Sequence, residues 1–114
     1  MTECIFCKIV AKKIPARIIH EDDLAIAFED INPQAPIHIL IIPRRHISTA
    51  LEITQADHAL IGHLFQVGAE IAQTRGIAEK GFRLVMNTNA DAGQAVFHIH
   101  LHLLGGRAMH WPPG

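Results

Sequence analysis

Apolar residues along the chain gather in several short runs and in one long periodic stretch, with polar turns between them. Residues 37–42 form the most apolar run, which is rich in β-branched side chains and ends at Pro43. Such a run is typical of a strand that is covered on both faces. Together the short runs predict five strands, at residues 18–19, 24–28, 37–42, 82–88 and 96–103.

The long periodic stretch predicts one long helix. Thr54 is suited to cap its N-terminus, and Asp57 three residues later favours the positive end of the helix dipole. Apolar residues then recur on one broad stripe, and Gly76 is a suitable C-cap. His58 and His63 lie off this stripe, so we expect both side chains to face solvent.

Two shorter segments complete the predicted organisation. Residues 4–11 indicate a short N-terminal helix that stops before Pro15, because proline disfavours a helical residue ahead of it. Residues 89–94 contain a glycine and have the length of a loop between antiparallel strands. We therefore predict a single α+β domain over residues 1–114. It has a five-stranded, mainly antiparallel sheet, one long helix and a short N-terminal helix.

Composition narrows the possible functions. The chain has 114 residues and a formal net charge of −1, with 49% hydrophobic and 18% charged residues. This balance is typical of a globular domain and argues against an electrostatic nucleic-acid binder. No signal peptide is visible, the most apolar run is far too short to cross a membrane, and two cysteines cannot build a disulfide framework. We therefore expect a cytoplasmic protein with no nucleic-acid partner and no membrane contact.

Histidine is the unusual residue, with nine copies against one Trp and no Tyr. Three of them, His98, His100 and His102, alternate with aliphatic residues, so a strand would place all three imidazoles on one face. That face could bind zinc through two of the imidazoles and leave a coordination position open. It could instead use one neutral imidazole as a nucleophile, with its neighbours moving protons and stabilising charge. The strict alternation argues against a mere row of surface histidines.

The segment 98–104 (HIHLHLL) resembles the signature of the histidine triad (HIT) superfamily, in which three histidines alternate with apolar residues. Other segments resemble the nucleotide-binding (Hint) branch of that superfamily: IFCKI at 5–9, IPA at 14–16, EDINPQAPIH at 29–38, PRRHI at 43–47 and GGRAMHWPPG at 105–114. The resemblance covers nearly the whole chain. It implies a HIT-like fold and a purine nucleoside phosphoramidase, which hydrolyses the P–N bond of adenosine or guanosine 5′-phosphoramidates.

The resemblance also implies catalytic roles for three histidines. By its position in the motif, His100 would attack the phosphorus and form a nucleotidyl-histidine intermediate that water then hydrolyses. His102 and His38 would flank the phosphate and donate hydrogen bonds to its oxygens. For His38, a core histidine bonded to the backbone is the alternative. Two other functions stay open: hydrolysis of dinucleoside polyphosphates, and regulatory nucleotide binding with little turnover.

The remaining nucleotide contacts are also implied by the resemblance. They are Asn87, Gly93, Gln94 and Ala95 for the phosphate, Asp30 and Ile31 for the ribose, and Ile5, Phe6, Ile9, Phe28 and Leu40 for the base. Core packing would explain the apolar residues equally well, and Asp30 could be a simple turn carboxylate. Position 95 departs from the animal proteins of this branch, which have a serine there, so that only the backbone amide of Ala95 can contact the phosphate or leaving group.

A Cys-x-x-Cys pair stands at the start of the chain. From spacing alone, Cys4 and Cys7 could be redox-active, could form half of a zinc site, or could be ordinary thiols. Bacterial HIT proteins with this pair imply a structural zinc ion held by Cys4, Cys7, His46 and His98. Catalysis by His100 requires no metal cofactor.

The C-terminal segment contains the single tryptophan, Trp111, among prolines. Members of the resembled branch are homodimers in which this segment reaches toward the active site of the partner. The resemblance therefore implies a homodimer, with Trp111 near the leaving group of a bound substrate. Purine nucleoside monophosphates and their phosphoramidates are the implied ligands.

Overall fold

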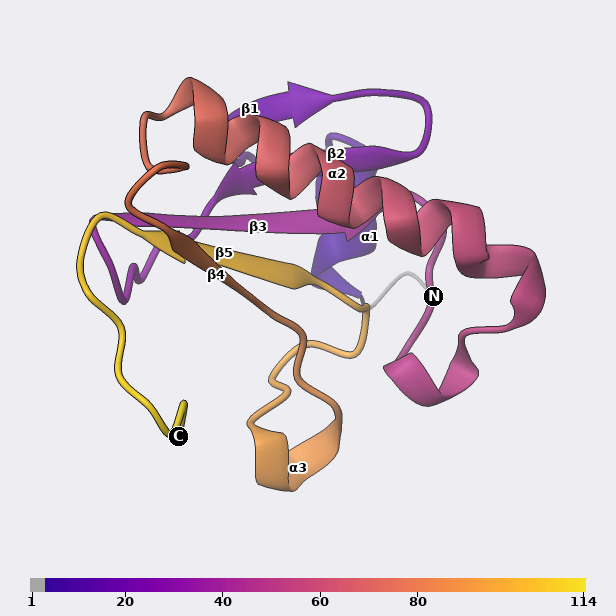
Figure 1. The fold of residues 1–114 in the computed structure, drawn as a ribbon. Helices are drawn as coiled ribbons and strands as arrows, with labels where there is room; N and C mark the ends of the chain where they lie inside the picture. The colour runs from indigo at the N-terminus through magenta and orange to yellow at the C-terminus, as the bar shows by residue number, and fades with distance from the viewer. Residues whose placement is uncertain (1–3) are drawn as a thin grey trace.

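The computed structural model describes residues 4–114. Figure 1 shows one twisted sheet with the longest helix lying across one of its faces. The strands are β1 (Ile18–Glu21), β2 (Ala25–Glu29), β3 (Ile37–Pro43), β4 (Phe82–Val85) and β5 (Leu101–Gly105). The helices are α1 (Ile5–Val10), α2 (His58–Thr74) and α3 (Asn89–Ala92), with short 3₁₀ turns at Ala50–Glu52 and Gln55–Asp57. The sheet order is β1-β2-β3-β5-β4 and each neighbouring pair is antiparallel, so the predicted α+β fold is confirmed.

The sheet is covered on both faces, by α2 on one and by α1 on the other. In β2, Ala25 and Ala27 belong to the core under α2, whereas Ile26 and Phe28 belong to a second core that includes α1. Side chains in β3 alternate between the same two cores, and residues 38–43 are all buried. Coverage on both faces is therefore the reason that 37–42 is apolar except for His38, as predicted.

The long helix begins and ends where the sequence predicts. Thr54 and Asp57 form a capping box around a 3₁₀ turn that leads directly into α2. The helix closes at Arg75, and Gly76 follows with a φ of 76°. This left-handed conformation favours glycine at the position after a helix. Within residues 4–114, no helix is long and apolar enough to span a membrane.

The last predicted strand is wrong in its extent. Regular pairing begins at Leu101 rather than residue 96, so of the three motif histidines only His102 lies in a strand. The preceding residues run past the end of β3, and Ile99 donates its backbone N–H to the Ile47 carbonyl at 2.7 Å. The predicted hairpin loop also differs, because α3 forms there and ends at Gly93, which has a φ of 86°.

The expectation that His63 simply faces solvent is also incorrect. Its Nε2 lies 2.7 Å from Oδ2 of Asp22, and Nε2 of His20 lies 2.6 Å from the same oxygen. The other Asp22 oxygen accepts the backbone N–H groups of Leu24 and Ala25. Burial favours the neutral carboxyl, but the hydrogen bonds outweigh it and lower the pKa of Asp22. These bonds tie α2 to the β1–β2 turn, whereas His58 is exposed as expected.

Gly106 offers a test of the turn that follows β5. Its φ is 92°, and a Cβ added there would lie 2.8 Å from Cβ of Pro36. We expect Gly106→Ala to lower the free energy of unfolding by about 1–3 kcal/mol, because the backbone would be strained and the proline ring cannot easily yield. Urea denaturation measures this loss. The control is Gly62→Ala in α2, where a Cβ meets nothing within 4 Å and unfolding free energy should not fall. Equal midpoints for Gly106→Ala and the parent would contradict this account.

Candidate active site and metal cluster

A cavity of about 370 Å³ lies where α1, the α1-covered face of the sheet and the segment after α3 meet. Two of the predicted catalytic residues, His100 and His102, line it. Its lining also includes most of the predicted nucleotide contacts: Ile5, Phe6, Ile9, Phe28, Asp30, Ile31, Leu40, Asn87, Gly93 and Ala95. An apolar slot next to polar groups suits a ligand with a flat ring and an anionic end.

His100 presents one ring nitrogen to this cavity. Its Nδ1 lies 2.8 Å from the carbonyl oxygen of His98. A carbonyl only accepts, so Nδ1 carries the proton and Nε2 keeps its lone pair. The ring is buried, and Phe6 packs edge-on against it with the ring centroids 5.1 Å apart. Burial lowers the pKa of His100 despite the opposing effects of His98 and Asp30. The result is a neutral, oriented imidazole at neutral pH, whose Nε2 lone pair has the chemistry that a nucleophile needs.

His102 and His38 form a second hydrogen-bonded unit beside it. Nδ1 of His38 accepts the backbone N–H of Gln34 at 3.0 Å, so its Nε2 carries the proton. That Nε2 lies 2.9 Å from Nδ1 of His102 and 3.4 Å from Oδ2 of Asp30. His102 therefore accepts at Nδ1 and keeps an N–H on Nε2. Burial and the charges of His100 and His38 lower the pKa of His102 to about 4, and burial also lowers that of His38.

His38 does not itself line the cavity. It is buried in β3 and reaches the site through His102, on the neighbouring strand, and through Asp30. The direct contact of His38 with a phosphate stays a prediction, whereas the alternative considered from the sequence applies, because His38 is a core histidine bonded to the backbone. It orients His102 from behind.

Gln94 needs a correction, because its side chain is turned away from the cavity. The side-chain oxygen accepts the backbone N–H of Asn89, and Nε2 donates to the carbonyls of Ser48 and Val96. The residue is buried and does not line the cavity. Gln94 therefore fixes the shape of the loop whose other members, such as Gly93, do line it.

Asp30 and Ile31 lie at the mouth of the cavity. One oxygen of Asp30 accepts the backbone N–H of Asn32 at 2.8 Å, which makes it a turn carboxylate. The other oxygen lies toward His38, and the residue lines the cavity, so its contact with a ribose stays a prediction. Ile31 is fully exposed, at 100% of its surface, which leaves it free to contact a ligand.

Trp111 is not brought to the cavity within this chain. It is 82% exposed and does not line the cavity. Arg83 of β4 donates to the carbonyl of His110 at 2.9 Å and holds the tail there, and Figure 1 shows the tail leaving the sheet on the side away from α2. Its predicted role at the leaving group of a partner subunit stays a prediction.

Cys4, Cys7, His46 and His98 converge to form what we call the CCHH cluster. Nδ1 of His98 lies 3.4 Å from Sγ of Cys4, 3.6 Å from Sγ of Cys7 and 3.2 Å from Nδ1 of His46. Zinc bonds of about 2.0–2.3 Å in a tetrahedron require donor separations of about 3.3–3.8 Å, so the spacing fits. Nε2 of His98 donates to the Pro43 carbonyl at 2.8 Å, which leaves the lone pair on Nδ1. Burial lowers the pKa of His98 and favours the neutral form that a ligand needs.

A second group of possible ligands, Asp30, His38 and His102, also lies close together. Here the hydrogen bonds do not suit a metal. Nδ1 of His38 already accepts from Gln34, so its Nε2 holds a proton rather than a free lone pair. The group is therefore arranged to hold and donate protons.

The HIT domain family matches residues 11–109, which is most of the chain. This chain belongs to the HIT family. It is 51% identical over 107 residues to the purine nucleoside phosphoramidase of Escherichia coli K12, covering 94% of this chain and 90% of that protein. It is 52% identical over 112 residues to an uncharacterised HIT-like protein of Synechocystis, covering 98% and 97%. A HIT family hydrolase of Legionella pneumophila has a similar structure, with a TM-score of 0.97, 50% identity, and coverage of 98% and 100%.

Several residues of this HIT site were not expected from the sequence. Ile14, Pro15 and Ala16 line the cavity, although the sequence predicts no ligand contact for this segment. Glu29 and Val96 line it as well. Glu29 and Val96 each adjoin a predicted contact in the sequence, so their place in the lining could have been expected. Ile14, Pro15 and Ala16 adjoin none, and only the fold brings them to the cavity.

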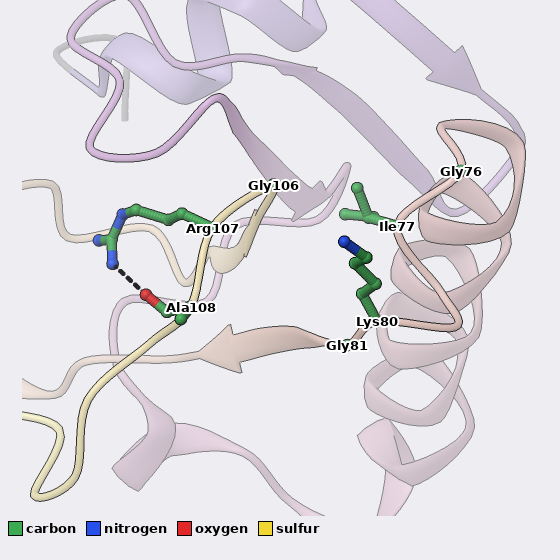
Figure 2. A pocket seen from close by; sticks show the side chains of 7 residues that line it. All are labelled: Gly76, Ile77, Lys80, Gly81, Gly106, Arg107 and Ala108. Carbon is green, nitrogen blue, oxygen red and sulfur yellow. Dashed lines mark hydrogen bonds between the residues drawn. The ribbon is translucent and has the colours of Figure 1, made fainter.

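A second cavity of this HIT protein, of about 510 Å³, lies where the end of α2, the start of β4 and the turn after β5 meet. Figure 2 shows Lys80 and Arg107 as its charged residues, with Arg107 bonded to the carbonyl of Ala108. The same guanidinium also donates to the carbonyl of Gln34. The lining contains no imidazole, thiol, hydroxyl or carboxylate side chain, and none of the predicted site residues. It is therefore not a candidate for the hydrolytic chemistry.

Proposed function

We propose that this protein is a purine nucleoside phosphoramidase, which hydrolyses the P–N bond of adenosine and guanosine 5′-phosphoramidates. One observation carries the proposal: Nε2 of His100 is unprotonated and faces a cavity that combines an apolar slot with an N–H of His102. The name of the Escherichia coli relative, at 51% identity, supports the same reaction. The names of the similar structures support hydrolase chemistry in general.

The reaction proceeds in two displacements at phosphorus. The lone pair on Nε2 of His100 forms a bond to the α-phosphorus, the P–N bond breaks, and the leaving nitrogen takes up a proton from solvent and departs as an amine. Water then attacks the phosphorus of the nucleotidyl-histidine and breaks its bond to Nε2. This step releases the nucleoside monophosphate, regenerates the neutral imidazole and returns one proton to solvent. Nε2–H of His102 donates to the phosphoryl oxygens, where charge increases in both transition states. His38 keeps that N–H in place by donating to the opposite ring nitrogen.

The nucleotide lies along the cavity in this proposal. The purine occupies the slot between α1 and residues such as Phe28 and Leu40, and Asp30 accepts hydrogen bonds from the ribose. Asn87 and the backbone around Gly93 and Ala95 contact the phosphate. Because Ala95 has no hydroxyl, its side chain cannot donate the proton that the leaving amine needs, so solvent supplies this proton.

The remaining parts of the proposal concern metal, assembly and location. Zinc in the CCHH cluster would supply only structural cross-linking, with Cys4, Cys7, His46 and His98 as its four ligands. The chain would act as a homodimer, with Trp111 extending toward the leaving group at the partner's site. A reducing compartment such as the cytoplasm would keep both thiols free to bind metal.

The decisive experiment is turnover of a fluorogenic adenosine phosphoramidate of tryptamine. We expect release of tryptamine and AMP, at a kcat/KM at least about tenfold above that for diadenosine tetraphosphate, because the leaving group decides the preferred reaction. Faster hydrolysis of the dinucleotide would favour the polyphosphate hydrolase instead. AMP binding without turnover of either substrate would favour the regulatory binder, to which the missing hydroxyl at Ala95 points.

A further inference from the structure

Helix α1 joins the CCHH cluster to the catalytic cavity. Ile5, Phe6 and Ile9 line the cavity, so this helix forms one of its walls. Phe6 is buried and packs edge-on against Phe28 at 5.5 Å and His100 at 5.1 Å between ring centroids. Any movement of α1 would therefore open the slot proposed for the base and uncover the nucleophile.

Few hydrogen bonds join α1 to the rest of the protein. α1 has six residues, and isolated helices shorter than about 12–15 residues are marginal in water. The backbone hydrogen bonds of the turn after it, such as Lys13 to Lys8, stay within the segment. In the part of the chain that the structure describes, the side-chain hydrogen bonds from residues 4–11 to the rest of the protein all come from the thiols of Cys4 and Cys7. Besides apolar packing against the sheet and an exposed Lys12–Glu21 ion pair just after the helix, the cluster is what holds α1 in place.

The CCHH cluster is also connected to His100, the proposed nucleophile, through the backbone carbonyl of His98. His98 is fully buried, its ring belongs to the cluster, and its carbonyl accepts the Nδ1–H of His100 at 2.8 Å. The next residue, Ile99, bonds to the carbonyl of Ile47, which adjoins the ligand His46. A fixed cluster therefore fixes both the α1 wall and the carbonyl that orients His100.

We propose that zinc binding to the CCHH cluster latches α1 onto the cavity, so that nucleotide affinity depends on whether zinc is bound. Four zinc bonds would stabilise the docked position of α1 far more than the weak contacts between thiols and imidazoles do. A ligand that binds only one of two states shifts the population toward that state. By reciprocity, a nucleotide in the cavity tightens zinc binding by the same factor. This inference rests on the nucleotide site proposed above.

The test compares the full-length parent protein loaded with one equivalent of Zn²⁺ with the same protein after chelation. Calorimetry measures AMP affinity, and trypsin cleavage after Lys8 reports whether α1 is docked. Without zinc, we expect the Kd for AMP to rise about tenfold and cleavage to accelerate by a similar factor. Calorimetric titration of Zn²⁺ with and without saturating AMP should give the reciprocal shift.

Two variants sharpen the comparison. Cys7→Ser should lose zinc and bind AMP like the chelated parent, whether or not Zn²⁺ is added. Ala11→Ser, at an exposed position just after α1, should keep the full zinc dependence. The chelated parent carries no substitution, so it tests the latch even where Cys7→Ser folds poorly.

Several results would overturn the latch. These are a parent protein that binds no zinc, or zinc binding that leaves both AMP affinity and trypsin cleavage unchanged. If AMP binds neither form, the nucleotide assignment fails, and the cleavage rates alone then decide whether zinc docks α1.

Discussion

Replacing His100 by alanine is expected to lower kcat for an adenosine phosphoramidate by about 10³-fold or more, because the covalent step has no other nucleophile. The ring that provides the lone pair is buried, held by the His98 carbonyl and packed by Phe6. No such arrangement is available to His102, whose Nδ1 accepts from His38 and whose Nε2 carries a proton. AMP affinity should change much less, because the base slot and Asp30 stay intact.

Two measurements test this expectation. Steady-state assays with the tryptamine phosphoramidate give kcat, and mass spectrometry of enzyme quenched during turnover should find a nucleotide on the peptide that contains His100. His58→Ala, at an exposed position at the start of α2, is the matched control and should behave like the parent. Undiminished turnover by His100→Ala, or an adduct at another histidine, would remove His100 as the nucleophile.

The parts of the fold that depend on local pattern were predictable. Residues 37–42 are apolar except for His38 because both faces of β3 are covered, and Thr54 with Asp57 marks the start of the long helix. The extent of the last strand could not be predicted in this way. It depends on a hydrogen bond between Ile99 and Ile47, two residues that lie far apart in the sequence. Strand alternation nevertheless predicted that His100 and His102 share one site, and both line the cavity.

The site shows the same division between what a pattern can and cannot predict. The motif and its resemblance led to the cavity residues and to the four members of the CCHH cluster, which do converge. The tautomers of the His38 and His98 rings are set by their partners, the Gln34 backbone amide and the Pro43 carbonyl. The spacing of residues in the sequence does not predict these contacts. The side-chain amide of Gln94 points away from the cavity for a similar reason, because three backbone groups from separate segments bind it.

The stability of the protein should fall as the pH decreases from 7.5 to 5, chiefly because of His102. Its pKa is about 4 in the folded state, against about 6.5 for an ordinary histidine in the unfolded chain. Between these values the unfolded chain binds a proton that the folded protein does not bind, so lower pH favours unfolding. The expected loss in unfolding free energy is about 2 kcal/mol between pH 7.5 and pH 5. Burial lowers the pKa of His38, His98 and His100 as well, and each adds a loss of the same sign.

Urea denaturation at several pH values between 5 and 7.5 measures this loss. His102→Gln removes one titrating ring and should make the dependence of unfolding free energy on pH less steep, whereas His110→Gln, on the exposed tail, should keep the slope of the parent. All three proteins are compared at equal zinc content, so that proton competition at the CCHH cluster cancels. Asp22 does not interfere, because its lowered pKa matters only as the pH falls below the range of an unfolded carboxyl, about 3.9. A parental slope in His102→Gln would show that the buried histidine pair does not control the acid sensitivity of this fold.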